Sequence, residues 1–227
     1  MTKTAHIVCA GPAGSAGVKD LAFALGKDDF LIAADGGYAA CMEAGLIPQL
    51  AVGDFDSLPG GKPVQLPCPC VELPCKKDDT DLMVCLQQAL QRGYRNVRIH
   101  RALGGDLGHT IAAIKCLAWL REQGARGVLF GCGQGAVIAM PEDRELDLST
   151  AAPVEVLDGM GNLAAETRVS VFAFGGDAHG VAECGLEWEL DGATLLASDH
   201  LGVSNATKSP RPTVSVGEGR LLVVIGG

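Results

Sequence analysis

Short apolar runs alternate with helical patterns from the start of the chain to about residue 145, and this alternation constrains the fold more than any other feature of the sequence. Each run ends near Gly, Asp or Pro. Such an order predicts an α/β domain, a mostly parallel sheet with helices on its faces. The expected strands are His6 to Cys9, Phe30 to Ala34, Leu50 to Val52, Val71 to Leu73, Val97 to His100 and Gly127 to Phe130.

Two helices are well marked in this part of the chain. One follows Asp79-Thr80 and ends before Gly93, and the other begins near His109-Thr110 and ends before Gly124. Apolar residues recur at helical spacing on one face of each. These residues are Leu82, Leu86, Ala89 and Leu90 in the first helix, and Ile111, Ile114, Leu117 and Ala118 in the second.

Beyond Pro141 the pattern changes to short β-like runs separated by Gly and Asp turns. We therefore predict two domains, an α/β domain over residues 1–145 and a small all-β domain, a sandwich, over 146–227. The expected runs are Val154 to Val156, Arg168 to Phe174, Gly185 to Leu190, Thr194 to Leu196 and Leu221 to Ile225.

The charge balance excludes several classes of partner. The formal net charge is −9, from 27 acidic and 18 basic residues, whereas nucleic acids and anionic membranes attract clustered Lys and Arg. The apolar run at the N-terminus is too short for a signal peptide, and no stretch approaches the roughly 18 apolar residues of a membrane span. We expect a cytoplasmic protein with a small-molecule partner.

The nine cysteines are scattered through apolar segments, where thiols in a reducing compartment act as small hydrophobic side chains. One cluster, Cys68, Cys70 and Cys75, has two interpretations. Three thiolates can hold zinc, but no fourth ligand stands nearby in paired spacing. The alternative is a proline-rich connection with buried thiols.

Three loops follow three of the expected strands and carry Asp and Gly. They are Ala34 to Gly37, Gly53 to Ser57, and Gly104 to His109. Ligands of open α/β sheets bind at the carboxyl ends of the strands. We therefore expect these loops to meet at one edge of the sheet.

Asp54 and Asp56 are the strongest candidates for metal ligands. Their spacing puts both carboxylates on the same side of an extended backbone, about 7 Å apart and closer if the loop turns. Mg²⁺ is usually held by one or two carboxylates together with phosphates and water. The alternative is a solvated Asp-rich turn capped by Ser57.

The segment from Lys76 to Asp81 opens a helix, so its acids and Thr80 have an obvious capping role. Together with the Asp54 loop it also supplies more carboxylates than one metal needs, and lysines to meet phosphates. The Asp35-Gly36-Gly37 turn permits close backbone approach to a ligand. The stretch from Gly11 to Gly17 matches neither common phosphate-loop spacing, so we interpret it as a flexible turn.

Taken in order, these motifs resemble the thiamine pyrophosphokinase family. The most specific are the GDFDS of residues 53–57 and the DDTD of 78–81. The others are the DGG of 35–37, Gly104-Gly105 with His109, the GLEW of 185–188 and the GVSN of 202–205.

The resemblance implies a pyrophosphoryl transfer from ATP to the hydroxyl of thiamine, with Mg²⁺, in a homodimer. It also implies that residues 1–145 form a Rossmann-like catalytic domain that binds nucleotide and Mg²⁺, and that residues 146–227 form a β-sandwich that binds thiamine. Each active site would lie between the N-terminal domain of one subunit and the C-terminal domain of the other. Trp188 would stack on the thiamine rings, with Ser204 and Asn205 helping to bind the substrate. Asp54, Asp56 and Asp78 are the implied metal ligands, Asp54, Asp56, Asp78 and Asp81 the catalytic acids, and Asp35, Gly36, Gly37, Lys77, Gly104, Gly105 and His109 the residues that bind cofactor and ATP.

Considered alone, Trp188 is expected on one face of a strand with Leu186 and Leu190, either as a core residue or as a cation–π partner for a thiazolium. His109 is a ligand contact or a helix-start residue. The chain departs from the family pattern at Asp106, where an arginine is usual, and at Gly108, where an aspartate is usual. Asp106 cannot clamp phosphate as arginine does, so Arg101 or a lysine would have to replace it.

Two other functions fit the same motifs. The acidic loops could transfer pyrophosphate to another hydroxymethyl heterocycle, such as a pterin, or the altered positions 106 and 108 could leave a thiamine or nucleotide binder without turnover. In the enzyme, Asp56 or Asp81 would accept the hydroxyl proton.

Overall fold

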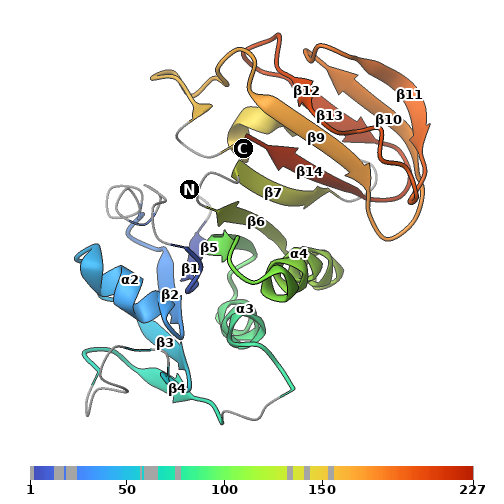
Figure 1. The fold of residues 1–227 in the computed structure, drawn as a ribbon. Coiled ribbons are helices and arrows are strands. Elements are labelled where there is room, and N and C mark those ends of the chain that lie inside the picture. The colour runs from blue at the N-terminus through green and yellow to red at the C-terminus, as the bar shows by residue number, and fades with distance from the viewer. Residues whose placement is uncertain are drawn as a thin grey trace. The chain divides into compact units, whose positions relative to one another are not determined.

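The computed structural model describes residues 3–12, 18, 25–56, 58, 66–74, 78–131, 135–140, 144–152 and 156–226. Backbone contacts divide the chain into two compact units, Met1–Cys132 and Gly133–Gly227 (Figure 1). We describe each unit by itself.

The N-terminal unit is built on a parallel sheet. In the described residues its strand order is β6-β5-β1-β2-β3-β4, with β1 at the point where the order reverses. Every neighbouring pair is parallel, which confirms the predicted α/β fold. The strands are β1 (Thr4–Val8), β2 (Phe30–Ala34), β3 (Leu50–Gly53), β4 (Cys70–Glu72), β5 (Asn96–Leu103) and β6 (Arg126–Gly131).

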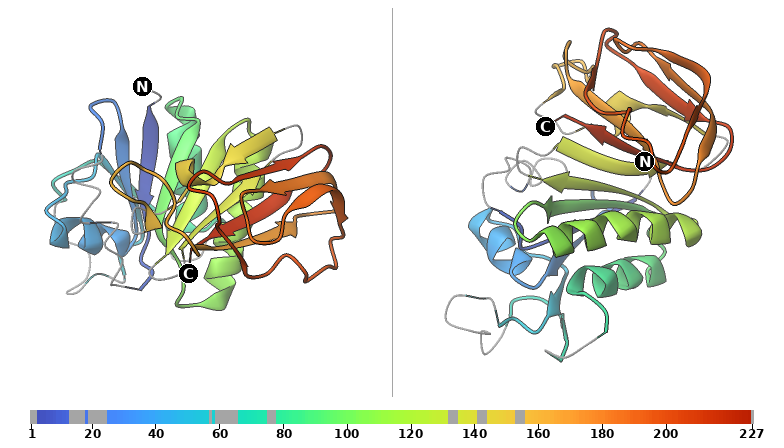
Figure 2. Two further views of the ribbon diagram at one scale, coloured as in Figure 1. Left: turned by 90° about the horizontal axis from the view of Figure 1, so that it is seen from above. Right: turned by 45° about the vertical axis from the view of Figure 1, so that its right-hand side comes forward.

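Helices cover both faces of this sheet (Figures 1 and 2). Helices α3 (Asp81–Gln91) and α4 (Leu107–Glu122) lie on one face and confirm the two predicted helices. The Thr80 hydroxyl caps α3 by accepting from the Met83 amide at 3.2 Å. Helix α4 begins at Leu107, two residues before the predicted start, because Asp106 caps it. The short α2 (Gly37–Glu43), on the other face, was not predicted.

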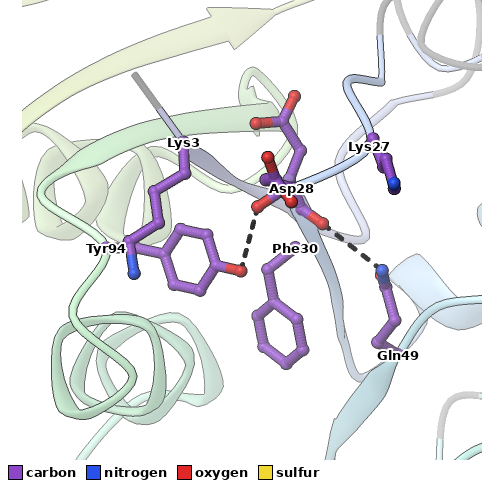
Figure 3. Close-up of a pocket in the computed structure, with 7 residues that line it drawn as sticks. Lys3, Lys27, Asp28, Phe30, Gln49 and Tyr94 are labelled. Atoms are coloured by element: carbon purple, nitrogen blue, oxygen red, sulfur yellow. Dashed lines mark hydrogen bonds between the residues drawn. The ribbon is translucent and has the colours of Figure 1, made fainter. Parts of the chain in front are cut away.

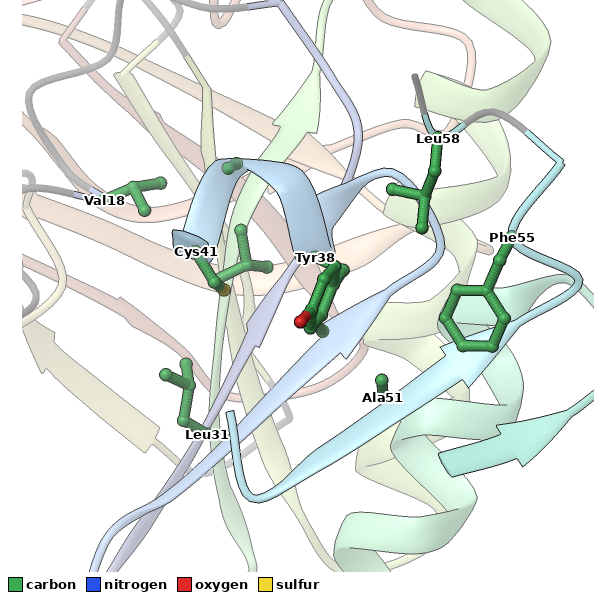
Figure 4. Close-up of a cluster of buried hydrophobic side chains, with 10 residues drawn as sticks. Val18, Leu31, Tyr38, Cys41, Ala51, Phe55 and Leu58 are labelled. Carbon is green, nitrogen blue, oxygen red and sulfur yellow. The ribbon is translucent and has the colours of Figure 1, made fainter. Parts of the chain in front are cut away.

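Helix α2 sits very close to the sheet. A Cβ atom on Gly37 would lie 1.9 Å from the carbonyl oxygen of Val8 in β1, so only glycine fits at the helix start. Beneath the helix a buried cluster joins α2, β2 and the loop after β3 (Figure 4). It contains Val8, Val18, Leu31, Ala33, Tyr38, Ala40, Cys41, Ala51, Phe55 and Leu58.

The C-terminal unit is a small antiparallel β domain, as predicted. It contains two four-stranded arrays in the order β12-β9-β14-β7 and β11-β10-β13-β8, and both contribute buried residues such as Val171, Val181, Val214 and Val223. The strands are β7 (Gly135–Met140), β8 (Arg144–Asp147), β9 (Arg168–Ala173), β10 (Ala178–Cys184), β11 (Leu190–Leu195), β12 (Asn205–Ala206), β13 (Thr213–Val216) and β14 (Leu221–Ile225), with a 3₁₀ turn η1 (Leu148–Thr150).

Two expectations for this unit need adjustment. The division after Cys132 lies before the expected boundary at 145/146, because β7 pairs with β14 and β8 pairs with β13. The predicted strand from Gly185 to Leu190 is wrong. That segment is a loop closed by a 2.7 Å hydrogen bond from the Gly185 amide to the Glu189 carboxylate, and β11 begins only at Leu190. Val154 and Glu155 lie outside the described residues.

Cysteine placement favours the interpretation as apolar side chains. Cys41, Cys85 and Cys116 are buried, and the described cysteines are free thiols. Burial raises the pKa of the Cys41 thiol to about 12, which keeps it protonated and unreactive. Cys70 is exposed at the start of β4, and Cys75 lies outside the described residues. In the part of the chain that is described, no helix is long and apolar enough to cross a membrane.

A buried histidine pair links two neighbouring strands of the N-terminal sheet, β1 and β5. His6 Nδ1 in β1 lies 3.2 Å from His100 Nε2 in β5, and the stacked rings are 3% and 8% exposed. Burial lowers the pKa of His6 to about 4, although Asp29 opposes the shift. Burial, with the charges of His6 and Arg98, lowers the pKa of His100 to about 3. Both rings are therefore neutral in the folded protein at pH 6.

This pair predicts an acid sensitivity. Between pH 6.5 and 5 the unfolded chain binds protons at both positions and the folded chain does not, so the free energy of unfolding falls as the pH falls. His100→Gln should reduce proton uptake on unfolding by about one proton across this window. Urea unfolding at several pH values measures the slope. The exposed His200→Gln is the matched control, and a slope in His100→Gln no different from that of the control would contradict the assignment.

Candidate active site

Three aspartates from neighbouring strands meet at the carboxyl edge of the N-terminal sheet. Asp35 follows β2, and Asp54 and Asp56 follow β3. One carboxylate oxygen from each lies within 4.8 Å of the others. Because β2 and β3 are parallel neighbours, their carboxyl ends lie side by side. The loops after these two strands therefore converge as the sequence led us to expect.

A buried phenylalanine shapes this acidic group. Phe55 lies between Asp54 and Asp56 in sequence, and its ring is fully buried in the cluster beneath α2 (Figure 4). Its backbone takes a left-handed conformation, with φ of 60°, which turns the loop out of the extended form. The two carboxylates consequently come closer than the 7 Å expected along a strand.

Backbone contacts hold Asp35 against this loop. Its Oδ1 accepts from the Phe55 amide at 3.1 Å, and its own amide donates to the Val52 carbonyl at 2.7 Å. A Cβ on Gly53 would lie 2.9 Å from the Asp35 Cα, so the approach of the two strand ends requires glycine there. This explains why the GDFDS motif begins with that residue.

The donor set fits Mg²⁺. Three carboxylate oxygens lie close enough together to bind one cation. Such hard oxygen ligands suit a small divalent cation that also keeps water and phosphate ligands. Close carboxylates also repel one another, and a bound cation removes that repulsion. In the described residues this is the one group of its kind, and it contains Asp35 but neither Asp78 nor Asp81. Asp78 is exposed before α3, and Asp81 is the first residue of that helix.

The third loop, after β5, is organised as a helix start. Gly104 and Gly105 have positive φ values of 85° and 72°, and Asp106 Oδ1 accepts from the His109 amide at 2.8 Å. Asp106 is thus an N-cap, a role that arginine cannot fill. Gly108 and the His109 side chain are exposed in the first turn of α4.

Arg101, just before these glycines, fastens the start of the loop after β1. Its Nε and Nη2 donate to the Gly11 carbonyl at 2.9 and 2.6 Å, and the Gly11 amide donates to the Arg101 carbonyl at 3.0 Å. Its guanidinium is therefore at least partly committed to the backbone. Lys77 and residues 13–17 lie outside the described residues.

In the C-terminal unit, Trp188 lies in the loop between β10 and β11. Its side chain is 65% exposed, whereas Leu186 is 1% exposed. The prediction that the two share one strand face is therefore wrong, because residues 185–189 form a loop and β11 begins only at Leu190. Asn205 hydrogen-bonds the Trp188 backbone, and Ser204, exposed with φ of 64°, precedes it. The structure therefore groups Trp188 with Asn205, next to Ser204.

A separate open pocket lies at the opposite ends of the sheet strands (Figure 3). It is lined by residues that precede or begin strands, including Lys3, Phe30 and Gln49. Internal bonds occupy several of its polar groups, for example Tyr94 Oη to the Asp28 carbonyl at 3.1 Å. The pocket therefore lies away from the acidic group, and no sequence motif pointed to it.

The acidic group predicts metal-dependent stability. Mg²⁺ should raise the midpoint of thermal unfolding by a few degrees, about 2–5 °C at saturation, because it binds only the folded arrangement. Asp54→Asn should abolish this shift and leave the metal-free midpoint equal or higher, since it removes one repelling charge. Scanning calorimetry with and without Mg²⁺ at constant ionic strength measures both. An equal shift in Asp54→Asn, or none in the wild type, would count against the site, and Asp191→Asn serves as the exposed-carboxylate control.

Comparison with known proteins places the chain in one family along its length. Residues 23–129 match the model "Thiamin pyrophosphokinase, catalytic domain", and residues 161–221 match "Thiamin pyrophosphokinase, vitamin B1 binding domain". Thiamine pyrophosphokinase of Bacillus subtilis is 25% identical over 226 residues, 98% of each chain.

Solved structures agree in fold. The crystal structure of the Bacillus subtilis thiamine pyrophosphokinase superposes with a TM-score of 0.78 at 22% identity, over 99% of each chain. That of Candida albicans superposes with a TM-score of 0.74 at 11% identity, over 100% of this chain and 90% of the other. With both of its domain models matched in order, the chain belongs to the thiamin pyrophosphokinase family.

Proposed function

We propose that the protein transfers a pyrophosphoryl group from ATP to the hydroxyl of thiamine, giving thiamine diphosphate and AMP. The observation that carries this proposal is the convergence of Asp35, Asp54 and Asp56 at the carboxyl edge of the sheet, inside the segment that matches the family's catalytic domain. An exposed tryptophan inside the segment that matches the vitamin B1 binding domain supports it.

Asp35, Asp54 and Asp56 would hold Mg²⁺, which when bound neutralises charge on the phosphates of ATP. The buried Phe55 ring and the hydrogen bond from the Phe55 amide to Asp35 would hold these carboxylates in place before substrate arrives, so that little reorganisation is needed. Asp78, near the start of α3, would complete the acidic surroundings from the neighbouring loop. Lys77 and the backbone of Gly36, Gly37, Gly104 and Gly105 would contact the nucleotide phosphates.

The reaction is an in-line displacement at the β-phosphorus. The thiamine hydroxyl oxygen forms a bond to that phosphorus, and the bond from phosphorus to the oxygen shared with the α-phosphate breaks, so AMP leaves with that oxygen. The hydroxyl proton passes to a carboxylate, Asp56 or Asp81. Positioning and electrostatics supply most of the rate in such transfers.

Trp188 would stack on the cationic thiamine, an attraction that an exposed indole can supply by cation–π contact. The net charge of −9 also suits a cationic substrate. Ser204, exposed beside Asn205, would contact the same ligand. His109, exposed in the first turn of α4, would lie near the nucleotide.

One observation favours a second candidate, a binder of thiamine or nucleotide without turnover. Asp106, where the family usually has a phosphate-clamping arginine, is committed to capping α4. Arg101 is tied to the Gly11 carbonyl, so the clamp would have to come from its remaining donors or from a lysine. Such a protein would bind thiamine or nucleotide but would not transfer the pyrophosphoryl group.

AMP formation decides between these functions. Purified protein with ATP, Mg²⁺ and thiamine should release AMP and thiamine diphosphate in equal amounts, and Asp54→Asn should lower the rate by about a hundredfold or more. Asp106→Asn keeps an N-cap acceptor and should stay active. If the protein binds thiamine but releases no AMP, it is a binder. If AMP forms with a pterin alcohol and not with thiamine, the pterin alcohol is the acceptor.

We also propose a cytoplasmic homodimer with each site shared between the α/β domain of one subunit and the β domain of the other. Subunit mixing tests the sharing. Asp54→Asn and Trp188→Ala proteins, unfolded and refolded together and assayed at thiamine well below the KM, should recover roughly a quarter of the wild-type rate, because half of the dimers contain one intact site. Recovery should be absent if each subunit builds its own site.

A further inference from the structure

Trp188 is held by an unusual contact, in which one side-chain amide binds both of its backbone groups. The Trp188 amide donates to Asn205 Oδ1 at 3.1 Å, and Asn205 Nδ2 donates to the Trp188 carbonyl at 2.7 Å. The Asn205 side chain thus pairs with Trp188 as a peptide group of a neighbouring strand would. The indole itself projects from this fixed backbone and is 65% exposed.

The same amide makes two more hydrogen bonds. Oδ1 also accepts from the Ala206 amide at 2.9 Å, and Nδ2 also donates to Glu183 Oε2 at 2.9 Å. A primary amide offers two N–H donors and two oxygen lone pairs. All four are used inside the protein, so the Asn205 side chain has no capacity left for a direct hydrogen bond to a substrate.

Glu183 reinforces the orientation of the amide that the Trp188 and Ala206 backbone groups also favour. With the amide reversed, its oxygen would face the Glu183 carboxylate and the Trp188 carbonyl, and its NH₂ group would face two N–H donors. The buried carboxylate, 3% exposed in β10, penalises that reversal more strongly than a neutral acceptor would. Burial raises the pKa of Glu183, and the hydrogen bond from Asn205 opposes the shift.

The other contacts of this loop hold residues 186 and 187 and not the backbone of Trp188. The Glu187 amide donates to the Ala206 carbonyl at 2.8 Å, and Leu186 bridges Thr207. The Glu187 side chain pairs with Lys208 on the surface at 3.0 Å. These interactions hold residues 186 and 187, and the Asn205 side chain extends the pairing to residue 188.

We infer that Glu183 is a positioning residue for the thiamine site: by fixing the Asn205 amide it holds the Trp188 backbone and presents the indole to the ligand. The inference rests on the proposed function for the identity of that ligand. Asn205 accordingly affects substrate binding by holding Trp188, and not by contacting the substrate itself. A buried carboxylate is costly, and presentation of an exposed aromatic platform is a reason for its presence.

The test compares Glu183→Leu, which removes the acceptor, with Glu183→Gln, which keeps one. Glu187→Gln, which breaks only the surface ion pair in the same loop, is the control. Hydrogen exchange of the Trp188 amide is measured in the full chain against that of Thr207, whose amide donates to the Thr167 carbonyl at 3.0 Å. Thiamine and ATP KM values and kcat are measured alongside.

In Glu183→Leu the Trp188 amide should exchange about tenfold faster relative to Thr207, and the KM for thiamine should rise about tenfold with kcat and the ATP KM within about twofold. Glu183→Gln and Glu187→Gln should resemble the wild type. Equal acceleration at both amides, or an unchanged thiamine KM in a protein that makes thiamine diphosphate, would overturn the inference.

Two provisions keep the test decisive. If Glu183→Leu does not fold, Asn205→Asp makes the same break with almost no change in volume, because it places an oxygen against Glu183 and the Trp188 carbonyl. If the wild type neither binds thiamine nor forms AMP, the proposed function fails, whereas the exchange ratio still reports whether Glu183 holds Trp188.

Discussion

Parallel pairing of β2 with β3 is the constraint on which the acidic site depends. The register sets Ala34 beside Val52, so the residues that follow the two strands leave the sheet side by side. Asp35 and Asp54 then meet although nineteen positions separate them in sequence. Phe55 completes the arrangement, because burying its ring in the cluster under α2 turns the loop and brings Asp56 to the same place. The free energy of apolar burial thereby offsets the repulsion of three carboxylates.

Glycine contributes to the site through close packing of the chain on itself. Gly37 meets the carbonyl of Val8, and Gly53 meets the backbone of Asp35. Both glycines belong to motifs whose sequence suggests contact with a ligand. Close approach of two backbone segments already requires each of them. Asp106 likewise lies in a loop expected to contact a ligand, and its carboxylate has a structural role because it caps α4.

In the C-terminal unit, polar side chains complete the backbone pairing of a loop. Asn205 stands in for a strand neighbour of Trp188, and Glu183 orients it from inside the domain. A tryptophan held in this way loses little backbone freedom when a ligand arrives, which lowers the entropic cost of binding. Exposure of the indole and rigidity of its backbone are thus produced by different residues.

The sequence by itself determined the α/β and all-β halves, most of the strands and both long helices, because hydrophobic period and capping residues are local signals. It also indicated Asp54 and Asp56 through their spacing and family likeness. It could not determine that Asp35 joins them while Asp78 stays outside the group, that Phe55 is the anchor, or that Gly185 to Leu190 is a loop. Those features depend on strand register, on left-handed backbone at single residues, and on hydrogen bonds between Glu183, Asn205 and Trp188. Such contacts join residues far apart in the chain, so only the tertiary structure decides them.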